Sequence, residues 1–247
     1  MKNYLLKISI FLVTLVLIVL QINMKFSHKN INTAAAPIQH TEEEKIVGSI
    51  PEASTILYAT EKEGELANFK LQLNGHILSF PKWMNVSNQT YYPQLYYSDI
   101  NDDEKKEIII VLTTGYGSEV IIQNVHVFNK TKNQVGESFK EIPVDNPISI
   151  INNSVKTTLN KSEAIIKIRN DINKINIKKL GIDPTHIFSN IAFGSVFKFE
   201  VTKNKLNAIV GATIAPSGGY LGDIYITYTF KDNGYKIDHI TFISSNN

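Results

Sequence analysis

The clearest structural signal in this chain is NFKLQLNGHILSFP, residues 68–81. Asn74-Gly75 stands between two runs in which apolar and polar residues alternate, a pattern typical of a β-hairpin with a two-residue turn. Phe69, Leu71 and Leu73 share one strand face, because successive side chains of a strand point to opposite sides. The stretch therefore predicts two antiparallel strands with one apolar face.

Strand patterns of the same kind recur near the C-terminus, with Asp232-Asn233-Gly234 as a hairpin turn, over residues 196–201, 206–214, 223–230 and 236–243. Between residues 146 and 190 the pattern is weaker. Asn146 as N-cap and Pro147 at the first position predict a short helix. Residues 164–170 and 174–180 are either two strands or one lysine-rich helix. We expect a mainly β domain of antiparallel sheets with one or two short helices.

The N-terminus carries an uncharged apolar segment, Ile8–Met24, preceded by Lys2 and Lys7. At about 1.5 Å per residue it spans roughly 25 Å, which suits a single transmembrane helix. A cleaved secretory signal is the alternative, but no small-residue cleavage site follows the segment closely. We therefore expect a signal anchor over residues 1–24, a flexible tether over 25–50 and an extracytoplasmic β domain over 51–247. If the signal is cleaved, the protein is secreted.

Composition restricts the partners of this domain. Without Lys2 and Lys7, the 25 basic residues fall to 23, which equals the number of acidic residues. Nucleic-acid binding usually requires a basic stripe, so we expect no nucleic-acid partner. The chain has no cysteine, which excludes disulfides and a lipid-modified cysteine.

The stretch SDINDDEKKEIII, residues 98–110, contains a candidate metal site. Four side chains with carboxylate or amide oxygens are spaced so that they can converge on one point: Asp99, Asn101, Asp103 and Glu107. The carbonyl of Lys105 adds a backbone oxygen, and such a set suits Ca²⁺. The site is not an EF-hand, because Ile110 stands where that loop needs a bidentate glutamate. The alternative is a polar turn whose acids face water.

These residues resemble the calcium loops of FG-GAP/VCBS-repeat proteins, whose pattern is D-x-[DN]-x-D-G-x-x-[DE] between two strands. The resemblance covers residues 90–130 and implies a structural Ca²⁺ held by Asp99, Asn101, Asp103, Lys105 and Glu107, in a bacterial membrane-anchored or secreted protein of unassigned function. Glu104 replaces the glycine of the pattern, where the backbone commonly turns through positive φ. A non-glycine residue there costs on the order of 1 kcal/mol.

No spacing typical of catalysis is present. The six histidines form no HExxH frame, and the chain has no G-x-S-x-G elbow. Tyrosines 91, 92, 96 and 97 could form a sugar-stacking or peptide-binding face, but alternation allows at most half of them on one side. We expect no catalytic residues and a binding or structural module with an unknown envelope partner or ligand. The alternative is a secreted or cell-envelope hydrolase acting on wall polymer.

Overall fold

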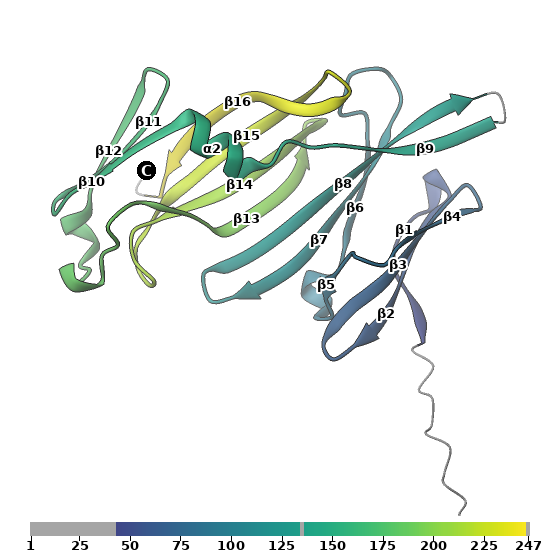
Figure 1. The fold of residues 1–247 in the computed structure, drawn as a ribbon, viewed down its shortest axis with the longest axis horizontal. Helices are drawn as coiled ribbons and strands as arrows, with labels where there is room; N and C mark the ends of the chain where they lie inside the picture. The colour runs from purple at the N-terminus through teal and green to yellow at the C-terminus, as the bar shows by residue number, and fades with distance from the viewer. Residues whose placement is uncertain (1–42, 134–135, 246–247) are drawn as a thin grey trace, which may run out of the picture. The chain divides into compact units, whose positions relative to one another are not determined.

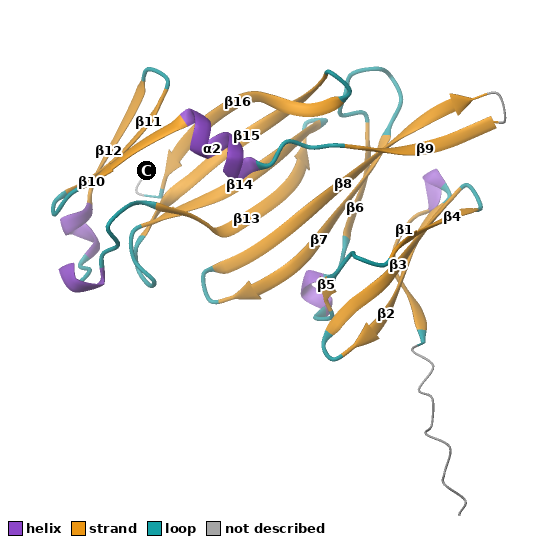
Figure 2. Cartoon of the chain, in the orientation of Figure 1, coloured by secondary structure: helices purple, strands orange, loops and turns teal. Residues whose placement is uncertain are grey.

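The computed structural model describes residues 43–133 and 136–245, of which the larger part is β-strand (Figures 1 and 2). These described residues are mainly β, as the sequence predicts: 63% of them are strand, in antiparallel and mixed sheets, and they include one α-helix. The predicted transmembrane segment Ile8–Met24 lies outside the described residues. Within the described ranges, no helix is both long and apolar enough to cross a membrane.

The first sheet is an antiparallel meander, in which each strand pairs with the next along the chain and a short fifth strand pairs with β3. Its strands are β1 (Glu44–Ile50), β2 (Thr55–Lys62), β3 (Glu65–Leu73), β4 (His76–Phe80) and β5 (Asn85–Val86). Asn74 and Gly75 have φ angles of 46° and 83°, as a tight hairpin turn requires. The hairpin predicted from residues 68–81 is therefore confirmed, and Phe69, Leu71 and Leu73 are all buried.

The regular structure begins earlier than the predicted boundary at residue 50. Glu44–Ile50 forms β1 and pairs with β2, although the sequence places these residues in the tether. Val47 and Ile50 are buried in the core of the first sheet. The three apolar side chains of this stretch do not alternate with polar ones, so the partner strand supplies the order that the sequence pattern lacks.

The second sheet has eight strands in the order β16-β15-β14-β13-β8-β7-β6, with β9 paired to β8. The strands are β6 (Gln94–Ser98), β7 (Glu107–Gly117), β8 (Val120–Asn133), β9 (Gly136–Ile142), β13 (Ala192–Thr202), β14 (Lys205–Thr213), β15 (Tyr220–Lys231) and β16 (Gly234–Ser244). Strands β8 and β13 are parallel and pair only at Ile121–Ile122 with Val196–Phe197. The four predicted C-terminal strands are β13–β16.

The middle of the chain forms a helix and a small third sheet. Helix α2 (Pro147–Ser154) begins after Asn146, whose side-chain oxygen accepts a hydrogen bond from Ser149 N at 3.1 Å. The predicted N-cap is therefore confirmed. Residues 164–170 and 174–180, for which the sequence allowed either two strands or one helix, contribute to strands. The sheet is antiparallel and consists of β10 (Val155–Leu159), β11 (Glu163–Ile168) and β12 (Asp171–Asn176). Four short 3-10 turns complete the described structure: Pro51–Ala53, Gln89–Tyr91, Ile177–Leu180 and Pro184–His186.

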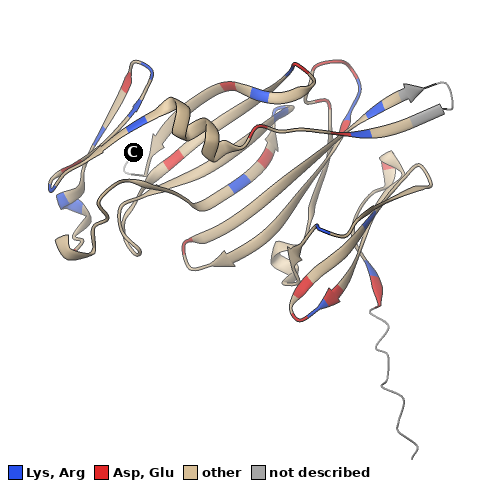
Figure 3. Cartoon of the chain, viewed as in Figure 1, with Lys and Arg blue, Asp and Glu red and all other residues tan. Residues whose placement is uncertain are grey.

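Strand β7 lies between two hydrophobic clusters and is buried on both faces. Ile109 and Val111 belong to a cluster with α2, the small sheet and β13–β16. Ile108, Ile110 and Leu112 belong to a second cluster with the first sheet. A strand covered on both sides needs apolar residues at every position, which accounts for the unbroken apolar run after Glu107. Figure 3 shows basic and acidic positions interspersed along the surrounding strands.

Candidate functional site

The acidic loop, residues 99–106, connects β6 to β7, and its acidic and amide side chains bond its own backbone. The Asp99 carboxylate accepts from the N–H groups of Asp103 and Glu104, at 3.2 and 2.9 Å. Asn101 Oδ1 also accepts from Asp103 N, at 3.0 Å. Asp103 Oδ1 accepts from Lys105 N at 2.9 Å. The backbone therefore wraps around the Asp99 and Asn101 oxygens.

Glu107 is the buried member of the set, with 2% of its surface exposed. Its carboxylate accepts from Ile100 N at 2.9 Å and from Asn101 Nδ2 at 3.1 Å. Burial, with the nearby Asp103 and Asp99 carboxylates, raises the pKa of Glu107 to about 7, against the hydrogen bond from Ile100. A nearby cation would reverse this effect, since an opposite charge stabilises the ionised carboxylate.

Tyr235, at the start of β16, lies beside the same carboxylate. Its side chain is fully buried, and its hydroxyl makes no hydrogen bond of good geometry to the described residues. Burial and the neighbouring Glu107 carboxylate raise the pKa of the Tyr235 hydroxyl. A buried hydroxyl without a partner is uncommon, because desolvation without a hydrogen bond carries a free-energy cost. The unsatisfied hydroxyl therefore faces the most buried acid of the loop.

Two further contacts hold the loop and the end of β6 to the β13–β14 hairpin. Ser98 Oγ donates to Asn204 Oδ1 at 2.9 Å, and Lys205 forms an ion pair with Asp102 at 2.5 Å. Together with Tyr235, these residues place two distant hairpins against one acidic loop. Asn204, Lys205 and Tyr235 lie outside the loop motif, and no local sequence signal identifies them.

At the position where the FG-GAP/VCBS pattern has glycine, the backbone of the loop has the expected positive φ. Glu104 has a φ of +66°, in the left-handed region that side chains other than glycine avoid. Asp102, two residues earlier, has a φ of +61°. Lys106 extends away from the carboxylates, with Nζ 5.1 Å from the centre of the Tyr97 ring.

The structure thus joins Asp99, Asn101, Asp103 and Glu107 in one hydrogen-bonded network, and Lys105 enters it through its N–H group. No group of three or more His, Asp or Glu side chains in the described ranges is arranged to hold a metal ion. Calcium sites also use amide and carbonyl oxygens, so that finding does not bear on the mixed donor set of this loop. Three carboxylates, an amide oxygen and an unsatisfied hydroxyl nearby are chemically suited to a hard cation.

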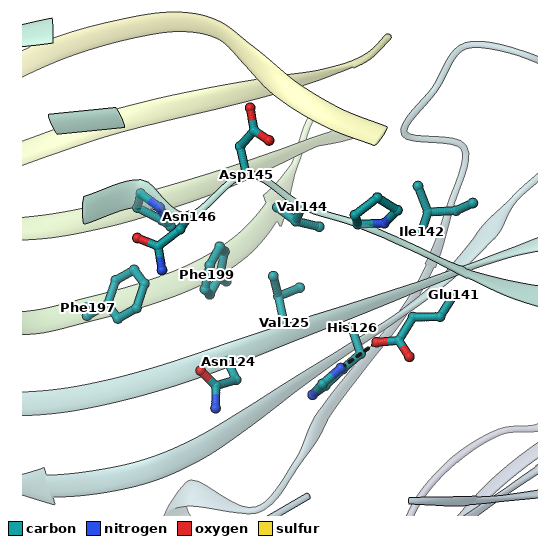
Figure 4. Close-up of a pocket in the computed structure, with 12 residues that line it drawn as sticks. Asn124, Val125, His126, Glu141, Ile142, Val144, Asp145, Asn146, Phe197 and Phe199 are labelled. Carbon is teal, nitrogen blue, oxygen red and sulfur yellow. Dashed lines mark hydrogen bonds and ion pairs between the residues drawn. The ribbon is translucent and has the colours of Figure 1, made fainter. Parts of the chain in front are cut away.

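A cavity of about 500 Å³ lies elsewhere in the fold, between β8, β13 and the segment that joins β9 to α2 (Figure 4). His126 Nδ1 and Glu141 Oε1 are 2.7 Å apart at its edge. The Trp83 ring stacks on the His126 ring, with centroids 3.9 Å apart. A histidine oriented by a carboxylate is a common element of hydrolase sites. Here the described lining includes no Ser, Thr or Cys, and its two acids, Glu141 and Asp145, contact His126 and Lys236.

The tyrosines considered above do not form a common face. Tyr96 packs against the cluster of α2 and β13–β16, whereas Tyr92 and Tyr97 pack against that of the first sheet. The Tyr91 ring instead contacts the Tyr116 ring in a tilted arrangement, with ring centroids 4.5 Å apart. Alternation along β6 separates Tyr96 from Tyr97, as the sequence predicts.

No protein-family model matches this chain, and a comparison with curated proteins finds no match. The likeness of the acidic loop to the FG-GAP/VCBS pattern therefore depends on residues 99–107 themselves.

Proposed function

We propose that this protein is a membrane-anchored, extracytoplasmic binding or structural module whose acidic loop holds a structural Ca²⁺. The observation that supports the calcium site best is the buried Glu107 carboxylate, with Asp99 and Asp103 nearby and the unsatisfied Tyr235 hydroxyl beside it. A bound cation would offset the repulsion among the three carboxylates.

The role of the ion would be structural. The Asp99 and Asn101 oxygens each accept a backbone hydrogen bond and keep a second lone pair for a cation. A calcium ion surrounded by protein oxygens has no open position for a substrate. The loop contacts the β13–β14 hairpin and Tyr235 of β16, so calcium would fix the relative positions of three hairpins.

The calcium proposal is tested by thermal unfolding of the full-length chain in calcium and in chelator. At about ten times Kd, calcium should raise the Tm by roughly 3–6 °C. The double variant Asp99→Ala, Asp103→Ala should lose this response. As a control of equal charge, Asp171→Ala with Asp238→Ala removes two exposed acids outside the loop and should keep it. Equal melting of the natural chain in both conditions would exclude the site.

The anchor proposal depends on the apolar segment Ile8–Met24 and the lysines before it. Intact-mass measurement of the protein from its native membrane should give the full chain, and alkaline extraction should leave it in the membrane pellet. A mature protein that lacks residues 1–24 and stays in the supernatant would instead indicate secretion.

A further inference from the structure

The cavity of Figure 4 has the features of a preformed ligand site. Its volume, about 500 Å³, lies within the range of small-molecule pockets, roughly 300–1,000 Å³. Phe197, Phe199 and Val125 contribute apolar surface, and Asn124 and Asn146 contribute amide groups from opposite walls (Figure 4). This mixture of aromatic surface and a few polar groups is typical of pockets that bind uncharged organic ligands.

The roof of the cavity is the strap, which we define as residues 143–146, and it is held firmly. Asp145 N donates to Tyr235 O at 2.9 Å, and Tyr235 N donates to Pro143 O at 2.8 Å. The Tyr228 hydroxyl donates to Asp145 O at 2.8 Å, and Lys236 pairs with the Asp145 carboxylate at 2.7 Å. Because the roof is already ordered, a ligand would not have to bear the entropic cost of ordering it.

The edge of the cavity at His126 is ordered as well. His126 is held between the Trp83 ring and the Glu141 carboxylate. Trp83 in turn stacks on Phe80, with centroids 3.9 Å apart, and belongs to the core of the first sheet. The His126 ring therefore has a fixed orientation at the edge of the cavity.

Two amide side chains retain unused hydrogen-bonding groups. Asn124 is exposed and makes no side-chain hydrogen bond to the described residues. Asn146 uses Oδ1 to cap α2, which leaves its Nδ2 donor for a ligand. Amide groups of this kind pair with hydroxyl and acetamido groups, which both donate and accept.

Charge narrows the ligand class further. Among the described residues that line the cavity there is no Lys or Arg, so none of them offers a fixed cation to a phosphate, sulfate or carboxylate group. The Asp145 carboxylate is neutralised by Lys236, and the Glu141 carboxylate is occupied by a hydrogen bond with His126. A neutral ring with an apolar face and several hydroxyl or amide groups fits best.

We propose that this cavity binds a neutral N-acetylated sugar, through the Asn124 and Asn146 amides and the apolar surface of Phe197 and Phe199. The sugar ring places its C–H face against the phenyl rings, and its acetamido and hydroxyl groups meet the two amides. The site goes beyond the calcium loop and does not depend on it. Tyr235 touches both, through its hydroxyl at Glu107 and its backbone at the strap.

The test is calorimetric titration of the full-length chain, in a detergent without a sugar headgroup, with N-acetylglucosamine and its β-1,4-linked dimer and tetramer. Trp83 is the single tryptophan and stacks on His126, so its fluorescence reports on the edge of the cavity. We expect saturable heat and a matching fluorescence change, with cellotetraose, which lacks the acetamido group, at least about tenfold weaker.

Two variants locate the site without removing structural contacts. Asn124→Ala removes an exposed amide, and Asn146→Ser removes the free donor while keeping an N-cap oxygen. Each should weaken binding about tenfold or more, with an unchanged circular dichroism spectrum. The matched control is Asn152→Ala, an exposed asparagine of α2 outside the cavity, and it should bind like the natural chain.

Titration in calcium and in chelator separates this inference from the calcium proposal. Sugar binding that persists in chelator supports the cavity whether or not the loop binds calcium. The inference is overturned by the absence of saturable heat up to about 10 mM sugar. It is also overturned if Asn124→Ala and Asn146→Ser bind the sugar as tightly as the natural chain does, or if a neutral peptide binds saturably and no sugar does.

Discussion

The turn Asn74-Gly75 and the acidic loop 99–106 each connect two antiparallel strands, but they depend on different surroundings. The turn uses two residues with positive φ, and glycine occupies the one at +83°. An added Cβ at Gly75 would meet nothing within 4 Å. The acidic loop is longer, places Glu104 at positive φ and ends on a buried carboxylate. The turn is therefore set by the conformation of two residues, whereas the loop is set by side-chain hydrogen bonds to its own backbone and by the buried carboxylate at its end.

The largest expected effect concerns the buried carboxylate. In chelator, the folded-state pKa of Glu107, about 7, lies above its usual value of 4.5. As pH rises from about 4.5 to 7, the unfolded chain releases this proton first, so the free energy of unfolding falls. The decrease should be at most about 3 kcal/mol and should be complete above pH 7. Denaturant titrations at a series of pH values measure it.

The variant Glu107→Gln provides the control for this pH dependence, because an amide does not titrate. Its unfolding free energy should change less between pH 4.5 and 7 than that of the natural chain. Saturating calcium should flatten the profile of the natural chain too, if the loop binds the ion. A profile of equal slope in Glu107→Gln would assign the pH dependence to other groups.

An intermediate effect on the free energy of unfolding is expected when glycine is removed from the turn and introduced into the acidic loop. Gly75→Ala should lower the free energy of unfolding by about 1 kcal/mol, because alanine at a φ of +83° is strained. Glu104→Gly should raise it by roughly 0.5–1 kcal/mol, since relief of strain at +66° exceeds the added entropy of the unfolded chain. Urea unfolding of both variants tests the comparison directly. Changes of the same sign would mean that backbone strain does not distinguish the two connections.

The smallest effect is expected at the ion pair between Lys205 and Asp102. The Asp102 side chain is 71% exposed, so water and salt screen the attraction. Lys205→Ala should change the unfolding free energy by less than about 1 kcal/mol, and high salt should remove the difference. A larger loss that persists in high salt would show that the β13–β14 hairpin holds the loop through more than this pair.

Much of the β architecture was predictable because its signals are local. Alternation, Asn74-Gly75 and Asp232-Asn233 indicate the hairpins, and Asn146-Pro147 indicates the start of α2. The four acidic and amide residues of the loop were also predictable as a group, because their spacing is a property of one short stretch. Glu104 was recognisable as the residue at an unfavourable φ by the same reasoning.

The remaining features depend on contacts between distant segments. β1 forms because β2 offers a partner, and β7 is buried on both faces because the two hydrophobic clusters meet there. Tyr235 and Glu107 are far apart in the sequence, and the packing of β16 brings them together. The cavity beneath the strap likewise requires β8, β13 and β16 in place. Residue patterns encode the periodicity and turns of each strand, whereas packing between strands determines which polar groups are buried and which face one another.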